Sequence, residues 1–265
     1  MKHTIAIIGC GEMGEQILAR LIQSYTPDAI VITRKNKIRG EAIAQKYGVT
    51  YSSSNSTAVT NAQIIFLCIK PQDFKGVLLE IAPHVAAPII ISIAAAISQS
   101  YIMSQIPRAV VLRYMPSPLI AERKGVALLV RDKQNGQRTK QIISQLNAWS
   151  SMLQTIPDKD MHIYTVLASC GSAFVAALLL KIFAVIGDSP THKKILTKVI
   201  NDTIISLVKK PTVQWRKMVA HASTPGGVTA KGIQVINSKA TTFLIKKVIR
   251  NAVRQSQRIQ KKSEQ

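Results

Sequence analysis

Apolar residues in the first part of the chain occur as short continuous runs separated by amphipathic stretches. The runs occupy residues 5–8, 29–33, 64–69, 89–93 and 110–114, and their only polar residues are Thr33, Ser92 and Arg113. Short runs that are apolar throughout are typical of strands in a parallel sheet that helices cover on both faces. The alternation of such strands with helical stretches predicts an α/β fold.

Weaker patterns complete this predicted sheet. Residues 49–51 fit a short strand, residues 125–130 an edge strand, and residues 153–156 a last strand that closes the sheet. Amphipathic stretches between the strands predict helices at residues 37–47, 73–84 and 137–149.

The pattern changes after Pro157, because no further run resembles a strand. The periodicity predicts helices at residues 158–187, 191–208, 213–221, 230–237 and 241–261. The first of them is expected to be broken or kinked near residues 169–172. The second part of the chain is therefore expected to be all-α.

A glycine motif joins the first strand to the first helix. Residues 9–14 place Gly9, Gly11 and Gly14 in the spacing Gly-x-Gly-x-x-Gly, with Glu12 and Met13 between the last two glycines. The first glycine permits a tight turn, the second lets a pyrophosphate approach the backbone, and the third lets the helix pack on the strand. The helix N-terminus offers N–H groups to the anion. The motif predicts dinucleotide binding; the alternative is a glycine-rich turn without a ligand.

The fold class that follows is an α/β Rossmann N-terminal domain and an all-α C-terminal domain. We place the NAD(P)-binding Rossmann domain at residues 1–157 and the α-helical domain at residues 158–265.

The residues after the second strand indicate which cofactor binds. An acidic residue there would bind the ribose hydroxyls of NAD, but Thr33 is followed by Arg34 and Lys35. The fork of N–H groups on Arg34 suits a 2′-phosphate. We therefore expect NADP(H), with NAD(H) as the alternative. These cations could also be solvated residues at the start of the next helix.

A second loop is expected beside the glycine motif. The strand at residues 64–69 contains Cys68 and ends at Lys70 and Pro71. Ligands of open α/β sheets bind at the carboxyl ends of the strands, so these three residues are expected to line the cofactor crevice.

The composition narrows the class of protein. Of 265 residues, 47% are hydrophobic, and 35 Lys and Arg against 13 Asp and Glu give a formal charge of +22. The basic residues are spread along the chain without a nucleic-acid-binding motif, so we expect no nucleic-acid partner, and a polyanion partner is the alternative.

The longest apolar run is too short to cross a membrane. The three cysteines lack metal-ligand spacing, so we expect reduced thiols, no metal and a cytoplasmic location.

Four segments together carry a resemblance to a known family. They are residues 9–14, Lys70-Pro71-Gln72, residues 169–174 and Thr224-Pro225-Gly226-Gly227-Val228-Thr229. In this order and spacing they resemble pyrroline-5-carboxylate reductases over nearly the whole chain, and residues 113–116 support the match.

The resemblance implies a reaction and a substrate site. It implies NADPH-dependent reduction of the imine of Δ1-pyrroline-5-carboxylate to L-proline, the last step of proline biosynthesis. The substrate carboxylate is expected on the loop formed by Thr224, Gly226, Gly227 and Val228, and the Thr229 hydroxyl on the ring nitrogen. The loop at residues 224–229 should then face the loop at residues 9–14 of the same chain or of a second copy.

Two further expectations depend on the same resemblance. Asn55 corresponds to an asparagine that contacts the cofactor. The resemblance also implies that residues 158–265 are an α-helical dimerisation and substrate domain, which builds a homodimer by interleaving helices, or a higher homo-oligomer.

Other functions stay open at this point. The segment Met115-Pro116-Ser117-Pro118 is shorter than in reductases, and residues 169–174 lack the usual proline. The segments at residues 169–171 and 66–74 resemble a late-competence branch of the family, so the alternative is a paralogue that binds NADP(H) with weak or no reductase activity. A β-hydroxyacid dehydrogenase with Lys181 as proton donor is the third reading.

Overall fold

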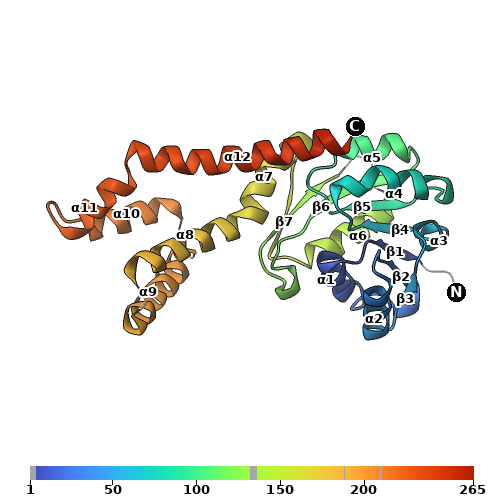
Figure 1. Cartoon of the computed structure of the whole chain (residues 1–265), viewed down its shortest axis with the longest axis horizontal. Helices are drawn as coiled ribbons and strands as arrows, with labels where there is room; N and C mark the ends of the chain where they lie inside the picture. Colours follow the sequence, from blue (N-terminus) through green and yellow to red (C-terminus); the bar gives the residue numbers. More distant parts are fainter. Residues whose placement is uncertain (1–3, 132–135, 188, 209–210) are drawn as a thin grey trace. The chain divides into compact units, whose positions relative to one another are not determined.

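The computed structural model of the protein describes residues 4–131, 136–187, 189–208 and 211–265. In these residues one sheet has the strand order β3-β2-β1-β4-β5-β6-β7-β8, with helices on both faces (Figure 1). The strands are β1 (Ile5–Ile8), β2 (Ile30–Thr33), β3 (Thr50–Ser52), β4 (Ile64–Leu67), β5 (Ile89–Ser92), β6 (Val110–Met115), β7 (Val126–Val130) and β8 (Met152–Thr155).

Helices connect most successive strands, as in repeated β-α-β units. They are α1 (Glu12–Leu21), α2 (Lys37–Tyr47), α3 (Asn55–Val59), α4 (Phe74–Ile81), α5 (Gln99–Gln105) and α6 (Gln137–Asn147). Residues 116–125, all of which the structure describes, join β6 to β7 without an α-helix. The α/β architecture expected from the apolar runs is confirmed.

Strand β1 shows why the first part of the chain folds in this way. Its four residues are fully buried, and successive side chains point to opposite faces of the sheet. Ile5 and Ile7 belong to the core that α1, α2 and α6 cover, whereas Ala6 and Ile8 belong to the core beneath α3, α4 and α5. A strand between two helical layers must be apolar at every position, which explains the continuous run.

The strand expected at the sheet edge is not at the edge. Strand β7 runs antiparallel to β6 on one side and parallel to β8 on the other. Its residues from Ala127 to Val130 are buried, because neighbours cover them on both sides. The edges are β3 and β8, so the prediction for residues 125–130 was wrong in position, although the strand itself exists.

The chain forms two compact units. Unit 1 comprises Met1–Gly171 and Val253–Gln265, and unit 2 comprises Ser172–Ala252. The predicted change of structure type at residue 157 is present, but the first unit extends further. Met161 and Val166 are buried, and Met161 shares a small core with Leu128 of β7, so this turn of helix packs on the sheet.

Unit 2 consists of helices (Figure 1). The helices of this half of the chain are α7 (Met161–Thr165), α8 (Gly171–Ile186), α9 (Pro190–Val208), α10 (Thr212–Ala222), α11 (Val228–Ile236) and α12 (Lys239–Ser263). Helices α7 and α8 are joined by a π turn at Val166–Cys170, so the irregularity expected near residues 169–172 is an extra residue within one helix and not a break.

One helical stretch has the length and composition of a membrane span. It covers Asp158–Ile186, with a mean hydropathy of 2.1, and none of its most apolar window is buried in the single chain. Length and composition alone do not distinguish a span from a helix that a second protein copy covers.

Candidate functional site

The loop between β1 and α1 has a backbone that requires its first glycine. Gly9 has a φ of +82°, and a Cβ atom there would lie 2.4 Å from Ile69 Cγ2 and 3.0 Å from the Cys68 carbonyl oxygen. Its N–H donates to Thr33 Oγ1 at 3.2 Å. Any other residue would be strained and would push the loop away from β4. The turn is therefore pressed against the carboxyl ends of β2 and β4.

The other two glycines shape the start of α1. Gly11 is the N-cap residue and has no side chain to cap the helix. A Cβ on Gly14 would meet the Gly9 carbonyl oxygen at 3.1 Å and Cys68 Cβ at 3.3 Å, so the first turn packs closely on the strand ends. Glu12 and Met13 occupy this first turn, where the leading N–H groups have no partners inside the helix. Such a turn is suited to bind an anion.

A hydrogen-bonded chain of side chains supports this loop. Thr33 Oγ1, which accepts from Gly9, donates to Asn55 Oδ1 at 2.7 Å. Asn55 Nδ2 donates to Glu80 at 2.8 Å, and the backbone N–H groups of Asn55 and Ser56 donate to the same carboxylate at 3.2 and 3.4 Å. Asn55 therefore has a set orientation at the carboxyl ends of the strands. No local sequence pattern indicates Glu80, because its partner Asn55 is 25 residues away.

The two cations after β2 have different surroundings. Arg34 Nη1 donates to the Cys10 carbonyl oxygen at 2.6 Å, which holds the guanidinium beside the glycine loop. Lys35 is exposed and forms an ion pair with Asp73 at 2.6 Å. The structure thus brings Arg34 to the loop, as expected for a residue that contacts the cofactor, whereas Lys35 already has a carboxylate partner.

The residues that follow β4 lie beside the same loop. Cys68 N–H donates to the Ile8 carbonyl oxygen at 2.8 Å, so the end of β4 lies alongside the end of β1. Lys70 is exposed and Pro71 begins a short 3-10 turn. Burial raises the pKa of the Cys10 thiol to about 12 and the pKa of Cys68 well above its usual range. Both thiols stay protonated near neutral pH, so neither is a nucleophile.

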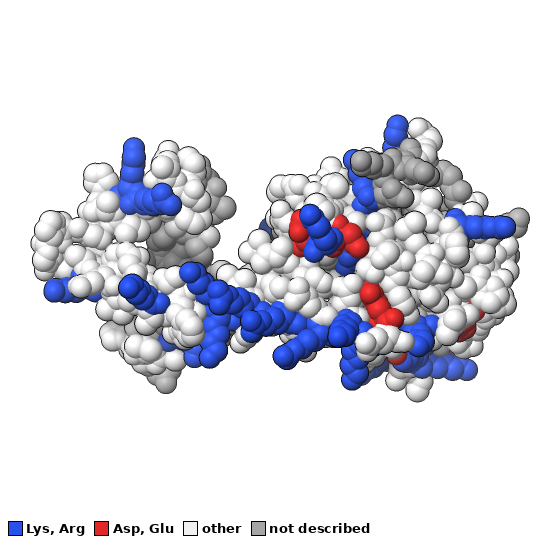
Figure 2. Space-filling view, turned by 90° about the horizontal axis from the view of Figure 1, so that it is seen from above, with Lys and Arg blue, Asp and Glu red and all other residues white. Residues whose placement is uncertain are grey.

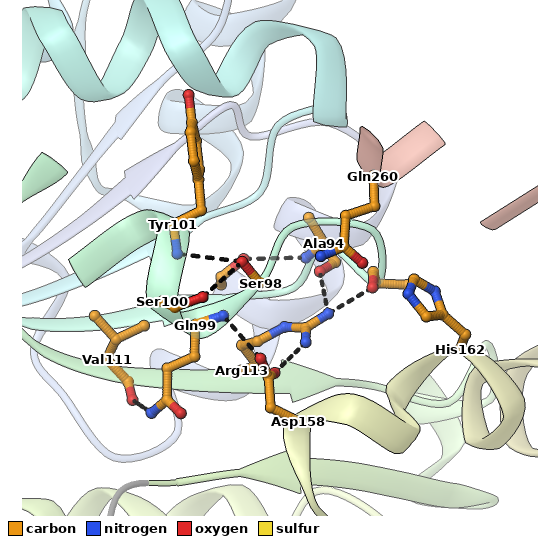
Figure 3. Close-up of polar contacts among 12 residues, drawn as sticks. Ala94, Ser98, Gln99, Ser100, Tyr101, Val111, Arg113, Asp158, His162 and Gln260 are labelled. Carbon is orange, nitrogen blue, oxygen red and sulfur yellow. Dashed lines mark hydrogen bonds and ion pairs between the residues drawn. The ribbon is translucent and has the colours of Figure 1, made fainter. Parts of the chain in front are cut away.

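Figure 3 shows a second polar cluster, at the carboxyl ends of β5 and β6. Arg113 is 2% exposed, forms an ion pair with Asp158 and donates to the carbonyl oxygens of Ala94 and Ala95. Asp158 also accepts from the Gln99 N–H at 3.3 Å. Arg113 therefore holds the loop after β5 against the residue that opens the helical part. The sequence identified Arg113 only as part of a family segment and did not reveal its partner.

The end of α12 packs beside this cluster within unit 1. His162 Nδ1 lies 2.8 Å from Ser256 Oγ, and the Ser98 N–H donates to Glu264 at 2.6 Å. Burial is the main reason that the pKa of His162 is lowered, and the Arg113 charge lowers it further. A hydrogen bond with Gln260 and the carboxylates of Asp158 and Glu264 act in the opposite direction.

The second glycine loop opens helix α11 in unit 2. Gly226 has a φ of +74°, and a Cβ on Gly227 would lie 2.5 Å from Thr224 Oγ1. Gly227 N–H donates to the Thr224 carbonyl oxygen at 2.9 Å, which closes the turn. Val228 and Thr229 form the first turn of α11, and Val228 is 94% exposed. The N–H groups at this helix end have no partners inside the helix, so the loop also suits an anion.

The structure divides the predicted site residues between its units. Gly9 to Gly14, Thr33, Arg34, Asn55 and Cys68 to Pro71 lie together in unit 1, and the loop at residues 224–229 lies in unit 2. That the two loops meet across a cleft stays a prediction. Among the described residues, no group of three His, Cys, Asp or Glu could hold a metal ion.

The segment at residues 115–118 is well packed. Ser117 is buried, and its Oγ accepts from the Leu119 N–H at 3.1 Å. A Cβ atom on Gly125 would lie 2.0 Å from the same Oγ, so only glycine fits at residue 125. The buried Arg20 of α1 donates to the carbonyl oxygen of Ile120 at 2.8 Å and to that of Ala121. Residues 117–121 therefore form a packed turn next to α1.

Comparisons with known proteins agree with this arrangement. The family model described as NADP oxidoreductase coenzyme F420-dependent matches residues 4–96, and the model described as pyrroline-5-carboxylate reductase dimerisation matches residues 158–259. A pyrroline-5-carboxylate reductase of Synechocystis sp. is 27% identical over 99% of this chain and 100% of its own length. The chain thus resembles pyrroline-5-carboxylate reductases along its whole length, and its helical part matches their dimerisation model. The match to the family expected from the four segments is confirmed.

Other relatives and solved structures extend the comparison. The pyrroline-5-carboxylate reductase of Corynebacterium melassecola is 25% identical over 87% of this chain and 89% of its own. A solved pyrroline-5-carboxylate reductase from Coxiella burnetii has a TM-score of 0.77 at 22% identity, covering 98% of this chain and 99% of that one. The Plasmodium falciparum enzyme, solved with NADP bound, has a TM-score of 0.79 at 20% identity, with the same coverage. At these identities the structures show the shared fold.

Proposed function

We propose that the protein reduces the C=N bond of Δ1-pyrroline-5-carboxylate with NADPH and releases L-proline. The observation that carries the proposal is the match to a reductase along 99% of this chain and 100% of that protein, which includes both glycine loops. The relatives found are pyrroline-5-carboxylate reductases, and no finding favours the competence-type alternative. A cyclic imine is already an electrophile, so the reaction needs no acid–base pair of carboxylates.

In the proposed reaction NADPH supplies the hydride when it is bound. The loop at Gly9, Gly11 and Gly14 binds the pyrophosphate, with Glu12 and Met13 lining the first turn of α1. Arg34 binds the 2′-phosphate, which its fork of N–H groups suits. Thr33, Asn55, Cys68, Lys70 and Pro71 line the rest of the cofactor site. Support comes from the hydrogen bonds that join Thr33 to Asn55 and Arg34 to the loop.

The proposed substrate site uses the loop of unit 2. The N–H groups near Thr224, Gly226, Gly227 and Val228 hold the substrate carboxylate. The Thr229 hydroxyl hydrogen-bonds the ring nitrogen and relays a proton from solvent to it, so the hydroxyl is unchanged after the reaction. The positive φ of Gly226 and the tight fit at Gly227 support a loop that is built before the substrate arrives. A site that is already formed loses little conformational entropy when the substrate binds.

The working unit in this proposal is a homodimer in the cytoplasm. The dimerisation model covers residues 158–259, and α8 to α12 expose many apolar side chains in the single chain. The three cysteines are unpaired thiols, as expected in a reducing compartment.

The experiment that tests the function measures NADPH oxidation by the purified protein in the presence of pyrroline-5-carboxylate. Proline is expected in equal amount to the NADPH consumed. Thr229→Val is expected to lower kcat/KM while leaving NADPH affinity unchanged, and Thr229→Ser to restore most of the rate. Tight NADPH binding without turnover would replace this proposal with the competence-type paralogue.

The cofactor contact has a separate test. Arg34→Gln is expected to weaken NADPH binding by about tenfold or more, since it removes a charge-assisted contact, and to change NADH binding little. Lys35→Gln is the matched control, because Lys35 already pairs with Asp73. Equal losses for both cofactors would remove Arg34 from the phosphate site.

A further inference from the structure

Helix α12 carries a high density of positive charge. Its residues from Lys239 to Ser263 include eight Lys and Arg and no Asp or Glu. The eight are all exposed: Lys239, Lys246, Lys247, Arg250, Arg254, Arg258, Lys261 and Lys262. The sequence already shows that residues 246–262 are the densest basic cluster of the chain, and it predicts an amphipathic helix with a solvated basic face there.

The helix collects these cations on one side. At about 100° per residue, all eight fall within an arc of roughly 160°. Five of them, Lys246, Arg250, Arg254, Arg258 and Lys262, follow each other at intervals of four residues along about 24 Å of the helix. Figure 2, which views the molecule from above, shows blue Lys and Arg atoms in a continuous line with few red atoms beside them. We call these eight residues the α12 basic face.

This charge is not neutralised within the described part of the chain. Lys35, Lys46 and Lys124 have carboxylate partners, but no residue of the α12 basic face forms an ion pair there. Glu264 follows the helix, and its carboxylate accepts from the Ser98 N–H. Eight unpaired like charges on one face repel each other, and a bound polyanion would relieve that repulsion.

We propose that the α12 basic face binds the phosphate backbone of duplex DNA without sequence preference. A line of cations about 24 Å long matches an extended anion and exceeds what one nucleotide needs. Three of the central cations are Arg, whose fork of N–H groups binds phosphate oxygens in pairs. The face includes one aromatic residue, Phe243, so it lacks the series of stacking side chains that single strands require.

The opposite side of α12 favours DNA over a membrane surface. Leu244, Ile245, Val248 and Ile249 line a groove of about 370 Å³ shared with α8 residues such as Phe174. A helix that lies in a membrane surface must insert its apolar side among lipids. In this protein the apolar residues of α12 are partly exposed in the single chain, but they share this groove with α8. Because the dimerisation model matches residues 158–259, a second copy of the chain is the expected occupant of the apolar side, which leaves the charged side for another partner.

The experiment measures binding of the full-length protein to a labelled mixed-sequence duplex DNA as the salt concentration rises. Five phosphate contacts predict a slope of about −4.5 for log affinity against log salt. The triple variant Arg250→Gln, Arg254→Gln and Arg258→Gln is expected to reduce that slope by about three units. Its NADPH oxidation is expected to stay at the wild-type level, which separates this inference from the proposed function.

The matched control removes the same charge elsewhere. Arg108→Gln, Lys140→Gln and Lys194→Gln replace three exposed cations outside α12, and this variant is expected to keep most of the slope. Equal loss in both triple variants would show that net charge, and not α12, attracts the DNA. No binding at low salt, or stronger binding to vesicles of anionic lipid than to DNA, would also overturn the proposal.

Discussion

The two units bury their apolar side chains in different ways. Unit 1 has two large cores, one on each face of the sheet, and a third small core beside β7. In unit 2, none of the side chains that the structure describes is buried, and large residues such as Leu178, Val185 and Phe243 are more than half exposed. Unit 1 can therefore fold on its own apolar contacts, whereas unit 2 lacks a core within one chain.

This difference explains why one helix resembles a membrane span. The stretch Asp158–Ile186 is apolar around much of its circumference, as a helix must be when neighbours cover it on several sides. In unit 2 those neighbours are missing from the single chain. Because the dimerisation model matches residues 158–259, a second copy is the occupant that fits. The apolar side chains of unit 2 that are exposed in one chain are therefore the ones that a second copy is expected to cover.

The largest expected effect comes from placing a charge on the exposed apolar surface of unit 2. Leu178 is 59% exposed and lines the groove between α8 and α12. Leu178→Glu would bury an unpaired carboxylate in the dimer, at a cost of about 3–5 kcal/mol, so association is expected to weaken by about a thousandfold. Light scattering should report a monomer that has lost turnover and still binds NADPH.

Unit 1 offers a matched control for this variant. Leu79 on α4 is 60% exposed, and Leu79→Glu is expected to leave both mass and activity unchanged. If the Leu178→Glu protein stayed dimeric, the exposed apolar surface of unit 2 would not be the dimer interface. A monomer with full activity would show that the reaction does not need the dimer.

The next effect compares the two glycine loops. Gly9→Ala forces a side chain into a backbone with a φ of +82° and against Ile69, and strain of about 1–3 kcal/mol is expected to weaken NADPH binding about 10- to 100-fold. Gly227→Ala is expected to raise KM for the imine substrate and to leave NADPH affinity unchanged, because its Cβ would meet Thr224. Calorimetry and steady-state kinetics separate the two losses.

The control variants for Gly9→Ala and Gly227→Ala replace glycines within helices of the same two units. A Cβ on Gly76 of α4 or Gly232 of α11 would meet nothing within 4 Å, so Ala at either position is expected to be tolerated. If Gly227→Ala weakened NADPH binding as much as Gly9→Ala, the division of roles between the loops would be wrong.

A smaller effect tests whether unit 1 alone orients its cofactor residues. Glu80→Gln removes the negative charge that accepts hydrogen bonds from the Asn55 side chain and from the backbone N–H groups of Asn55 and Ser56. Because Glu80 is exposed, the loss is expected to be about 1 kcal/mol, or about a fivefold rise in KM for NADPH with kcat unchanged. Glu122→Gln, which removes an exposed carboxylate paired with Lys124, is the control. Equal effects of both changes would show that Glu80 acts only through general charge.

The smallest expected effect is a pH dependence of stability that comes from His162, which contacts Ser256 near the end of α12. Burial lowers the pKa of His162 in the folded protein, so the unfolded chain takes up this proton more readily. The free energy of unfolding is therefore expected to fall as the pH drops below about 6.5, the usual pKa of histidine. His162→Gln should flatten this decline in denaturant titrations, and His84→Gln controls for the loss of a histidine. A decline that His162→Gln leaves unchanged would assign the effect to other groups.

Much of unit 1 could be predicted from the sequence because its signals are local. The continuous apolar runs of β1, β4 and β5 identify strands buried on both faces, and the three glycines of residues 9–14 identify the turn and its ligand class. The position of β7 inside the sheet was not predictable, because strand order depends on pairing between distant segments. For the same reason, the hydrogen bond between Asn55 and Glu80, which are 25 residues apart, was not predictable.

In this protein the sequence by itself determined the α/β and all-α halves, the two glycine loops and the cation after β2. Each depends on spacing between near neighbours, which local backbone geometry converts directly into structure. Only the tertiary structure decided that Arg113 pairs with Asp158, 45 residues away, and that Ser98 meets Glu264, 166 residues away. Such contacts depend on how whole elements pack, and no local pattern of residues encodes that packing.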